Sequence, residues 1–318
     1  MQLVILSARP AMLAGTLRSV GAHLPFVDAV LVVTPGRLVA EVRALGVEVV
    51  TDEQLLDGAG PTDHSHRNYL LRAALAGCPA VAEVFLSADD DNRPLVEVPE
   101  TAFVRDGRHR RYAFGSLDDW DARATSYDRC LLATRQVLAL HAMPRVAYAS
   151  HMPQVVDKAL LAEVVALLAP AAARHPLDEW ASYGNVAGAL HPDRFEPAEP
   201  YVTLGWPEDA STWQPLLDPG ALLFENCFLE HYAAGEVFDG IDPDDLSYAA
   251  AVDKVVRWRG YELAVLAGDR SAALADHPQP GPVGRALRAA RSRTLGDPVL
   301  RERQQRAATA AAVRAQQR

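Results

Sequence analysis

The chain has 318 residues, of which 49% are hydrophobic and 23% are charged, and its formal net charge is −10. This composition is typical of a soluble globular protein, and the negative balance argues against nucleic acid as a partner, because phosphate binding needs a surplus of Lys and Arg. The three cysteines show no C-x-x-C spacing, so we expect neither a disulfide framework nor a zinc site.

The first third of the chain alternates between apolar runs of strand length and segments of helical periodicity. The predicted strands are 3–6, 27–33 and 47–50, and the predicted helices between them are 11–22 and 38–45. A further helix should begin at Thr62 or Asp63, which are both suitable N-caps, and run to about Ala76. This order predicts an α/β fold with a mixed, mainly parallel sheet flanked by helices.

A short apolar run at 84–88 ends in three consecutive carboxylates, Asp89, Asp90 and Asp91. In open α/β sheets, ligands bind beyond the carboxyl ends of the strands, and adjacent carboxylates repel one another unless a cation neutralises them. We therefore expect Asp89 and Asp91 to bind Mg²⁺ or Mn²⁺, with Asp90 supporting them or contacting a bound sugar. The alternative is a solvated acidic turn that caps the next element.

Beyond residue 95 the pattern is mixed. Short strands are predicted within 96–114, a helix at 121–141 and a long amphipathic helix at 155–168. The last of these contains Asp157, Lys158 and Glu163, which argues against a membrane span. Residues 174–240 are rich in Pro, Gly and aromatic side chains and are expected to form a substrate-binding subregion.

The end of the chain is basic. Residues 283–318 contain nine Arg against two acidic residues, so an acidic body precedes a basic, helix-permissive tail. An Arg-rich helix can lie on an anionic membrane, although a solvated helix, a frayed terminus or an oligomer contact is the more ordinary role, because the apolar residues of the tail are mostly Ala and Val. The N-terminal segment does not resemble a signal peptide, so we expect a cytoplasmic protein, with peripheral membrane contact through the tail as an option.

The order of elements, together with a strand that ends in a D-x-D sequence, resembles the GT-A fold of nucleotide-sugar glycosyltransferases over about the first third of the chain. The resemblance implies that Asp89 and Asp91 hold a divalent ion against the donor diphosphate. It also implies that the turn after the first strand and the helix before the acidic strand contact the nucleotide. The residues at these two positions are Ser7, Ala8 and Arg9, and His66, Arg67 and Arg72.

The same resemblance implies an acidic base at a later loop or helix start and a histidine that completes the metal shell. Asp178 and Glu179, directly before Trp180, match the first feature, although either could simply cap a helix. His191 and His231 are both candidates for the second. Acceptor contacts are further options at Glu225, Asn226 and Glu230.

The segment Ser150-His151-Met152-Pro153-Gln154 resembles Stealth-type and capsular-polysaccharide transferases, in which a His-x-Pro element heads a helix. This resemblance implies that His151 acts as an acid/base or contacts phosphate. The alternative is a helix-start histidine that bonds to the backbone. The first turn, Ser7-Ala8-Arg9-Pro10, departs from the aromatic-and-Asp motif with which those proteins open.

These observations predict a metal-dependent glycosyltransferase that moves a sugar from a nucleotide diphosphate to a glycan or lipid-linked glycan, as in polysaccharide biosynthesis. A Stealth-like sugar-1-phosphate transferase and a non-catalytic nucleotide-sugar-binding protein remain alternatives, and a homo-oligomer is possible. We expect a catalytic domain at 1–282, with a nucleotide-binding half at 1–95 and an acceptor-binding half at 96–282, followed by the basic helical tail at 283–318.

Overall fold

The computed structural model describes residues 1–318 except 59, 114, 121–124, 149–150, 205–221 and 267–318. The chain divides into two compact units. The first contains residues 1–203 and 223–225, and the second contains residues 204–222 and 226–318. The predicted domain boundaries at 95 and 282 stay predictions, and the predicted helical tail lies outside the described residues.

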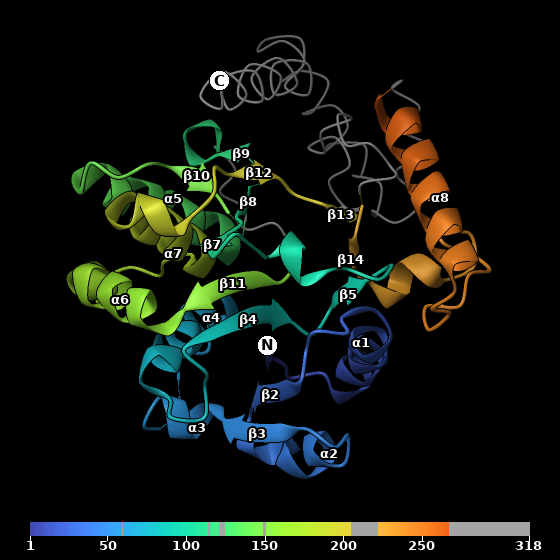
Figure 1. The fold of residues 1–318 in the computed structure, drawn as a ribbon, viewed down its shortest axis with the longest axis horizontal. Helices are drawn as coiled ribbons and strands as arrows, with labels where there is room; N and C mark the ends of the chain where they lie inside the picture. Colours follow the sequence, from blue (N-terminus) through green and yellow to red (C-terminus); the bar gives the residue numbers. More distant parts are fainter. Residues whose placement is uncertain (59, 114, 121–124, 149–150, 205–221, 267–318) are drawn as a thin grey trace, which may run out of the picture. The chain divides into compact units, whose positions relative to one another are not determined.

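A five-stranded sheet forms the centre of the described part of the first unit, in the order β11-β4-β1-β2-β3 (Figure 1). Its strands are β1 (Gln2–Leu6), β2 (Ala29–Thr34), β3 (Glu48–Thr51), β4 (Val84–Asp89) and β11 (Gln154–Asp157). The pairs that join β3, β2, β1 and β4 are parallel, whereas β11 runs antiparallel to β4. The predicted mixed, mainly parallel sheet is therefore confirmed.

Helices cover both faces of this sheet. In β1, Val4 and Leu6 belong to an apolar layer shared with α4, α5, α6 and α7, whereas Leu3 and Ile5 belong to a second layer shared with α1 and α2. This alternation follows from the two-residue period of a strand, and burial on both faces explains why the strand sequences are almost continuously apolar. The helices are α1 (Pro10–His23), α2 (Val39–Arg43), α3 (Asp52–Leu55), α4 (His64–Ala74), α5 (Ser126–Leu140), α6 (Lys158–Ala172) and α7 (Glu179–Leu190).

Short strands make up most of the remaining regular structure of the first unit. These are β5 (Asn92–Pro94), β6 (Val104–Arg105), β7 (Arg108–His109), β8 (Tyr112–Ala113), β9 (Gly115–Ser116), β10 (Val146–Ala147), β12 (Glu199–Pro200), β13 (Thr203–Leu204) and β14 (Phe224–Asn226), the last two reaching the unit boundary. The short strands predicted within 96–114 are thus confirmed as β6, β7 and β8. The predicted helix at 121–141 corresponds to α5, while residues 121–124 lie outside the described residues.

The helix predicted to begin at Val155 is wrong in its first residues. Val155 and Val156 lie in β11, where β-branched side chains fit the pleated surface, and α6 begins only at Lys158. Asp157 marks the change, because its Oδ1 accepts hydrogen bonds from the backbone N–H groups of Ala159 and Leu160 at 3.0 and 3.2 Å.

The second unit contains α8 (Tyr248–Leu266) and a short 3₁₀ turn, Leu229–Tyr232. Trp258 on the buried side of α8 packs against Phe238, with ring centroids 6.3 Å apart. Within the described residues, no helix combines the length and the apolar character needed to cross a bilayer.

Candidate functional site

The strand order places two loops side by side at one edge of the sheet. The chain leaves β1 through α1 and returns as β2 on one side, whereas β4 pairs with β1 on the other side. Such a reversal of strand order leaves a crevice outside the carboxyl ends of the two strands, where ligands bind in open α/β sheets. Because Leu6 pairs with Asp89, the segment after β1 lies beside the acidic turn that follows β4.

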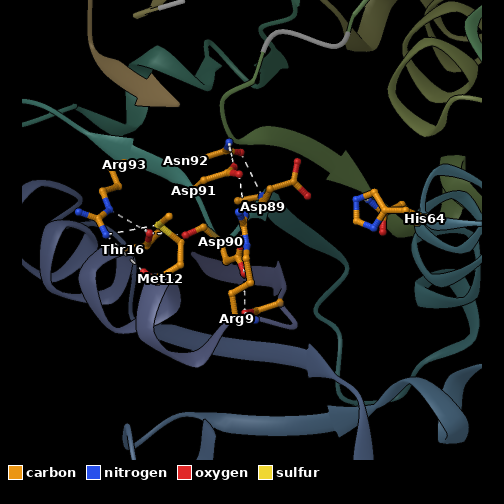
Figure 2. Close-up of polar contacts among 12 residues, drawn as sticks. Arg9, Met12, Thr16, His64, Asp89, Asp90, Asp91, Asn92 and Arg93 are labelled. Atoms are coloured by element: carbon orange, nitrogen blue, oxygen red, sulfur yellow. Dashed lines mark hydrogen bonds and ion pairs between the residues drawn. The ribbon is translucent and has the colours of Figure 1, made fainter. Parts of the chain in front are cut away.

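Asp90 points inward and fastens these two loops together (Figure 2). Its Oδ2 accepts hydrogen bonds from the Ser7 hydroxyl at 2.7 Å and from Arg9 Nε at 3.3 Å, and its Oδ1 accepts from Arg9 Nη2. The Thr16 hydroxyl donates to the carbonyl oxygen of Asp90. Asp90 is 3% exposed, so its carboxylate serves the structure of the turn and supports its neighbours.

Asp89 and Asp91 flank this anchored residue. Asp91 Oδ2 accepts a hydrogen bond from Arg9 Nη2 at 2.7 Å, while the Asn92 amide donates to Asp91 Oδ1 and accepts from the Asp89 backbone N–H. Burial and, to a lesser extent, the charge of Asp89 together raise the pKa of Asp91 to about 7 against the opposing effect of Arg9. The turn therefore carries more negative charge than Arg9 neutralises.

The chemistry of this turn fits a hard divalent cation. Among the described residues, no group of three or more His, Cys, Asp or Glu side chains is arranged to hold a metal ion. Mg²⁺, however, typically takes one or two protein carboxylates and completes its shell with water and substrate phosphate oxygens. Asp89 and Asp91 could supply such a pair, and a cation beside them would offset both the cost of burying the Asp91 charge and its repulsion with Asp89.

The turn after β1 presents an exposed cation beside the acidic turn. The Arg9 side chain is 49% exposed although it contacts Asp90 and Asp91, and Ala8 beside it is exposed as well. Ser7 is buried and bound to Asp90. Of the three residues predicted here to contact nucleotide, Ala8 and Arg9 are therefore accessible, and Ser7 supports the loop.

The three candidates on the helix before β4 have different surroundings. Arg72 is 5% exposed, and its Nη2 donates to Asp89 Oδ1 at 2.5 Å. Arg67 pairs instead with Asp52 at the start of α3. His66 lies in the first turn of α4, where its backbone N–H donates to the Asp63 cap. Asp63 was one of the two predicted caps, and of these three candidates Arg72 is the one with a hydrogen bond to the acidic turn.

The predicted acidic base lies at the start of α7. Asp178 is the N-cap: it is 2% exposed, and its Oδ1 accepts from the Ala181 backbone N–H at 2.6 Å. Glu179 Oε1 lies 3.4 Å from Arg72 Nε. Burial raises the pKa of Asp178 to about 6 and that of Glu179 to about 8, the latter also because Asp178 is adjacent. Glu179 is therefore the candidate whose carboxyl group is not used for capping.

His151 precedes β11 rather than a helix, so the helix start implied by the resemblance to Stealth-type transferases and the helix-start alternative are both wrong. Its φ of +49° is unusual for a residue with a side chain. Burial lowers its pKa to about 4, against the opposing effect of the Asp89 charge. The imidazole is thus uncharged at neutral pH, where it is a weak base and brings no positive charge to a phosphate. Ser150, the first residue of its motif, lies outside the described residues.

His231 belongs to the second unit. It is buried, and its ring meets that of Phe228 edge-on at 5.6 Å. Its metal role stays a prediction. His191, the alternative, lies at the end of α7, where its Nε2 is 2.8 Å from Glu163 Oε2. Glu225 belongs to the first unit, whereas Asn226 and Glu230 belong to the second.

Sequence reasoning missed two residues of this region. Tyr127, in the first turn of α5, has a pKa well above its usual value because it is buried and close to Asp178 and Glu179. No local pattern marks it, because its proximity arises from the packing of α5 against α7. Ser87 accepts a hydrogen bond from Arg72 Nη1. Its position in the buried strand β4 was a usable signal, because a polar residue there needs a partner.

No protein-family model and no curated protein matches this chain. Among solved structures, it is similar to galactosyltransferase LgtC in complex with donor and acceptor sugar analogs, at 12% identity and a TM-score of 0.41 over 82% of this chain and 95% of that chain. It is also similar to mouse xyloside xylosyltransferase 1, at 13% identity and a TM-score of 0.37 over 62% and 84% of the two chains.

A third similar structure is glucosyl-3-phosphoglycerate synthase from Mycobacterium tuberculosis in complex with Mn²⁺, UDP-glucose and phosphoglyceric acid. The identity is 18% and the TM-score 0.31 over 50% of this chain and 57% of that chain. Over shorter alignments this chain spans 31% of a mycobacterial protein and 33% of the same synthase. Because all these values are low, the functional proposal depends on the residues of the chain itself.

Proposed function

We propose that this protein is a glycosyltransferase that moves a sugar from a nucleotide diphosphate donor to a hydroxyl group of a glycan or lipid-linked glycan. One observation carries the proposal. Asp89, Asp91 and Arg9 lie together at the carboxyl ends of β1 and β4, at the point where the strand order reverses. A diphosphate can be bound through a divalent cation held by two carboxylates and through an accessible guanidinium that bonds to its oxygens, and these groups are present together here.

We propose that Arg9 binds the donor diphosphate. Its guanidinium is exposed on one side, so it can bond a phosphate oxygen while Asp90 holds its other N–H groups. Asp89 and Asp91 would hold Mg²⁺ or Mn²⁺, which when bound offsets the negative charge that develops on the departing diphosphate. Ser7 keeps the Asp90 anchor in place, and exposed Ala8 leaves room for the nucleotide beside the loop.

We propose that Glu179 takes the proton from the attacking hydroxyl group of the acceptor. A carboxylate can take the proton of an attacking hydroxyl only when it is ionised and within hydrogen-bond reach. With a pKa of about 8, Glu179 fills this role in the fraction of molecules in which it is ionised, and that fraction grows as the pH rises. Asp178 holds the first turn of α7, which fixes the position from which the Glu179 side chain extends. His151 is the weaker candidate for this role, because burial lowers its pKa to about 4 and so disfavours the protonated imidazole.

The test uses Asp91→Asn, which keeps the shape of the side chain but removes the charge. Binding of Mn²⁺ and of a panel of nucleotide sugars is measured by titration calorimetry, and nucleoside diphosphate release is measured in the presence of glycan acceptors. We expect metal-dependent donor affinity to fall at least about tenfold, or ~1.4 kcal/mol. The control is Asp118→Asn, which removes a charge from an exposed pair with Arg145.

Three outcomes would change the proposal. Full metal-dependent affinity in Asp91→Asn would contradict the metal assignment. Tight donor binding without nucleotide release or transfer in the wild type would favour a non-catalytic binding protein. A product that retains the donor phosphate would favour the sugar-1-phosphate transferase.

A further inference from the structure

Arg72 occupies a closed position between the acidic turn and the start of α7. Its guanidinium donates to three groups of β4: the Ser87 hydroxyl, the Ala88 carbonyl oxygen at 3.3 Å and Asp89 Oδ1 at 2.5 Å. Its Nε lies 3.4 Å from Glu179 Oε1. The ring of Trp180 covers one face of the guanidinium, with the Cζ atom 4.1 Å from the ring centroid.

These contacts exclude one role and indicate another. Because Arg72 is 5% exposed and its N–H groups already face four protein oxygens, it is not available to grip a donor phosphate, unlike Arg9. Instead, one rigid planar group contacts two carboxylates from segments far apart in the sequence. The bonds to Ser87 and Ala88 fix the plane of the guanidinium relative to β4. Through that plane, Asp89 and Glu179 are both held in place relative to the same strand.

We propose that Arg72 is a positioning residue that holds Asp89, the candidate metal ligand, and Glu179, the candidate proton acceptor, at a fixed separation. This inference deepens the proposed glycosyltransferase function and rests on it. Arginine suits the task because its fork of N–H groups has a defined geometry, whereas a lysine ammonium is a single point on a flexible stem. Without the bridge, the Asp89 carboxylate and Glu179 would each sample several rotamers.

The decisive variant is Arg72→Lys. It keeps the positive charge that faces the two carboxylates, but one ammonium cannot reach Ser87, Asp89 and Glu179 together. Lysine is smaller than arginine, so it fits the space beside Ser87 and Glu179, which a cavity of about 30 Å³ adjoins. A matched control is Arg111→Lys, because Arg111 also donates to backbone carbonyls, of Gly184 and Glu196, and lies 4.9 Å from an aromatic ring, that of Phe195.

We expect Mn²⁺ affinity, measured by calorimetry without nucleotide, to fall at least about tenfold in Arg72→Lys, as is usual when a group that orients a metal ligand is lost. We also expect kcat for sugar transfer to fall at least about a hundredfold, with a smaller change in KM for the donor. Arg111→Lys should retain both values within about twofold. If the two variants lose thermal stability alike and Arg72→Lys keeps wild-type Mn²⁺ affinity and kcat, the role is merely structural and the proposal is overturned.

Crystal structures separate this inference from the proposed function. If wild-type protein binds neither Mn²⁺ nor nucleotide sugars, the proposed function fails, yet the bridge can still be examined. In Arg72→Lys, a changed distance between the carboxyl groups of Asp89 and Glu179, or loss of order in either, would support the positioning role. Unchanged positions of both carboxyl groups would overturn it.

Discussion

Asp90 and its two neighbours show how adjacent carboxylates acquire different tasks. Asp90 is almost fully buried and bound to Ser7 and Arg9, while Asp89 and Asp91 have more exposed side chains and face Arg72 and Arg9. The alternation follows from the turn, in which the Asn92 side chain accepts the Asp89 backbone N–H at 3.0 Å. The middle residue secures the loop, and the outer two are the proposed cation ligands.

Glu179 gives a prediction about stability and pH. Its pKa is about 8 in the folded protein against an ordinary value of 4.5, so between these values the folded state holds a proton that the unfolded state has released. The free energy of unfolding should therefore fall as the pH rises through this window. Glu179→Gln, which is neutral at every pH, should show a smaller fall, as measured by urea unfolding in metal-free buffer.

The control for this experiment is Glu41→Gln, because Glu41 is exposed on α2. It should reproduce the wild-type dependence on pH. Part of the fall should persist in Glu179→Gln, because burial also raises the pKa of Asp178 and of Asp91. Identical pH dependence in wild type and Glu179→Gln would show that the Glu179 carboxyl group is not raised in pKa by its surroundings.

At the scale of elements, the absence of a side chain at Gly184 allows α7 to pack closely against Tyr148. A Cβ atom on Gly184 would lie 2.7 Å from Tyr148 Cγ, and Tyr148 is itself buried. The packing of α7 matters for the site because Asp178 and Glu179 stand at its first turn. The close packing of α7 against Tyr148 therefore helps to set the position of the predicted base at the start of this helix.

Gly184→Ala and Gly21→Ala form a matched pair of helix substitutions. Gly184→Ala should lower the free energy of unfolding by about 1–3 kcal/mol, the usual cost of inserting a methyl group into a packed contact. Gly21, in α1, has no atom within 4 Å of an added Cβ, so Gly21→Ala should raise the free energy by up to ~1 kcal/mol. Urea unfolding measures both. Equal effects of the two substitutions would contradict the close packing at Gly184.

At the scale of the whole molecule, the prominent sequence feature is the separation of charge between an acidic body and a basic end. Residues 283–318 hold nine Arg, and they lie outside the described residues, so their role stays a prediction. A protein that adds sugar to a lipid-linked glycan would benefit from weak attraction to an anionic membrane. Such attraction is electrostatic and falls with rising salt concentration.

Deletion of residues 283–318 should weaken co-sedimentation with vesicles that contain anionic lipid. Each basic residue near such a surface contributes about 1 kcal/mol, so removing nine Arg against two acidic residues should abolish measurable binding. Neutral phosphatidylcholine vesicles serve as the control and should bind neither form. Unchanged binding of the shortened chain to anionic vesicles would exclude the tail as the membrane contact and leave the oligomer contact to be examined.

Local chemistry explains why much of the first 95 residues could be predicted. Most strands and helices up to β4 were identified because apolar runs of strand length and helical spacings are visible in any short window, whereas the four-residue helix α3 was not predicted. The Asp63 cap was identified because a cap bonds to its own backbone a few residues ahead. Val155 and Val156 were assigned to a helix because the continuous apolar run 155–168 hides the change from β11 to α6.

The sequence by itself determined that the chain alternates strand and helix, that β4 ends in three carboxylates and that arginines precede it. Only the tertiary structure decided that Arg72 rather than Arg67 meets Asp89, that Asp90 turns inward and that Glu179 reaches the same guanidinium. Periodicity reports which face of an element is buried, but not which distant segment covers it. That choice depends on the pairing of β1 with β4 and on the packing of α4 against α7, which bring together residues far apart in the chain.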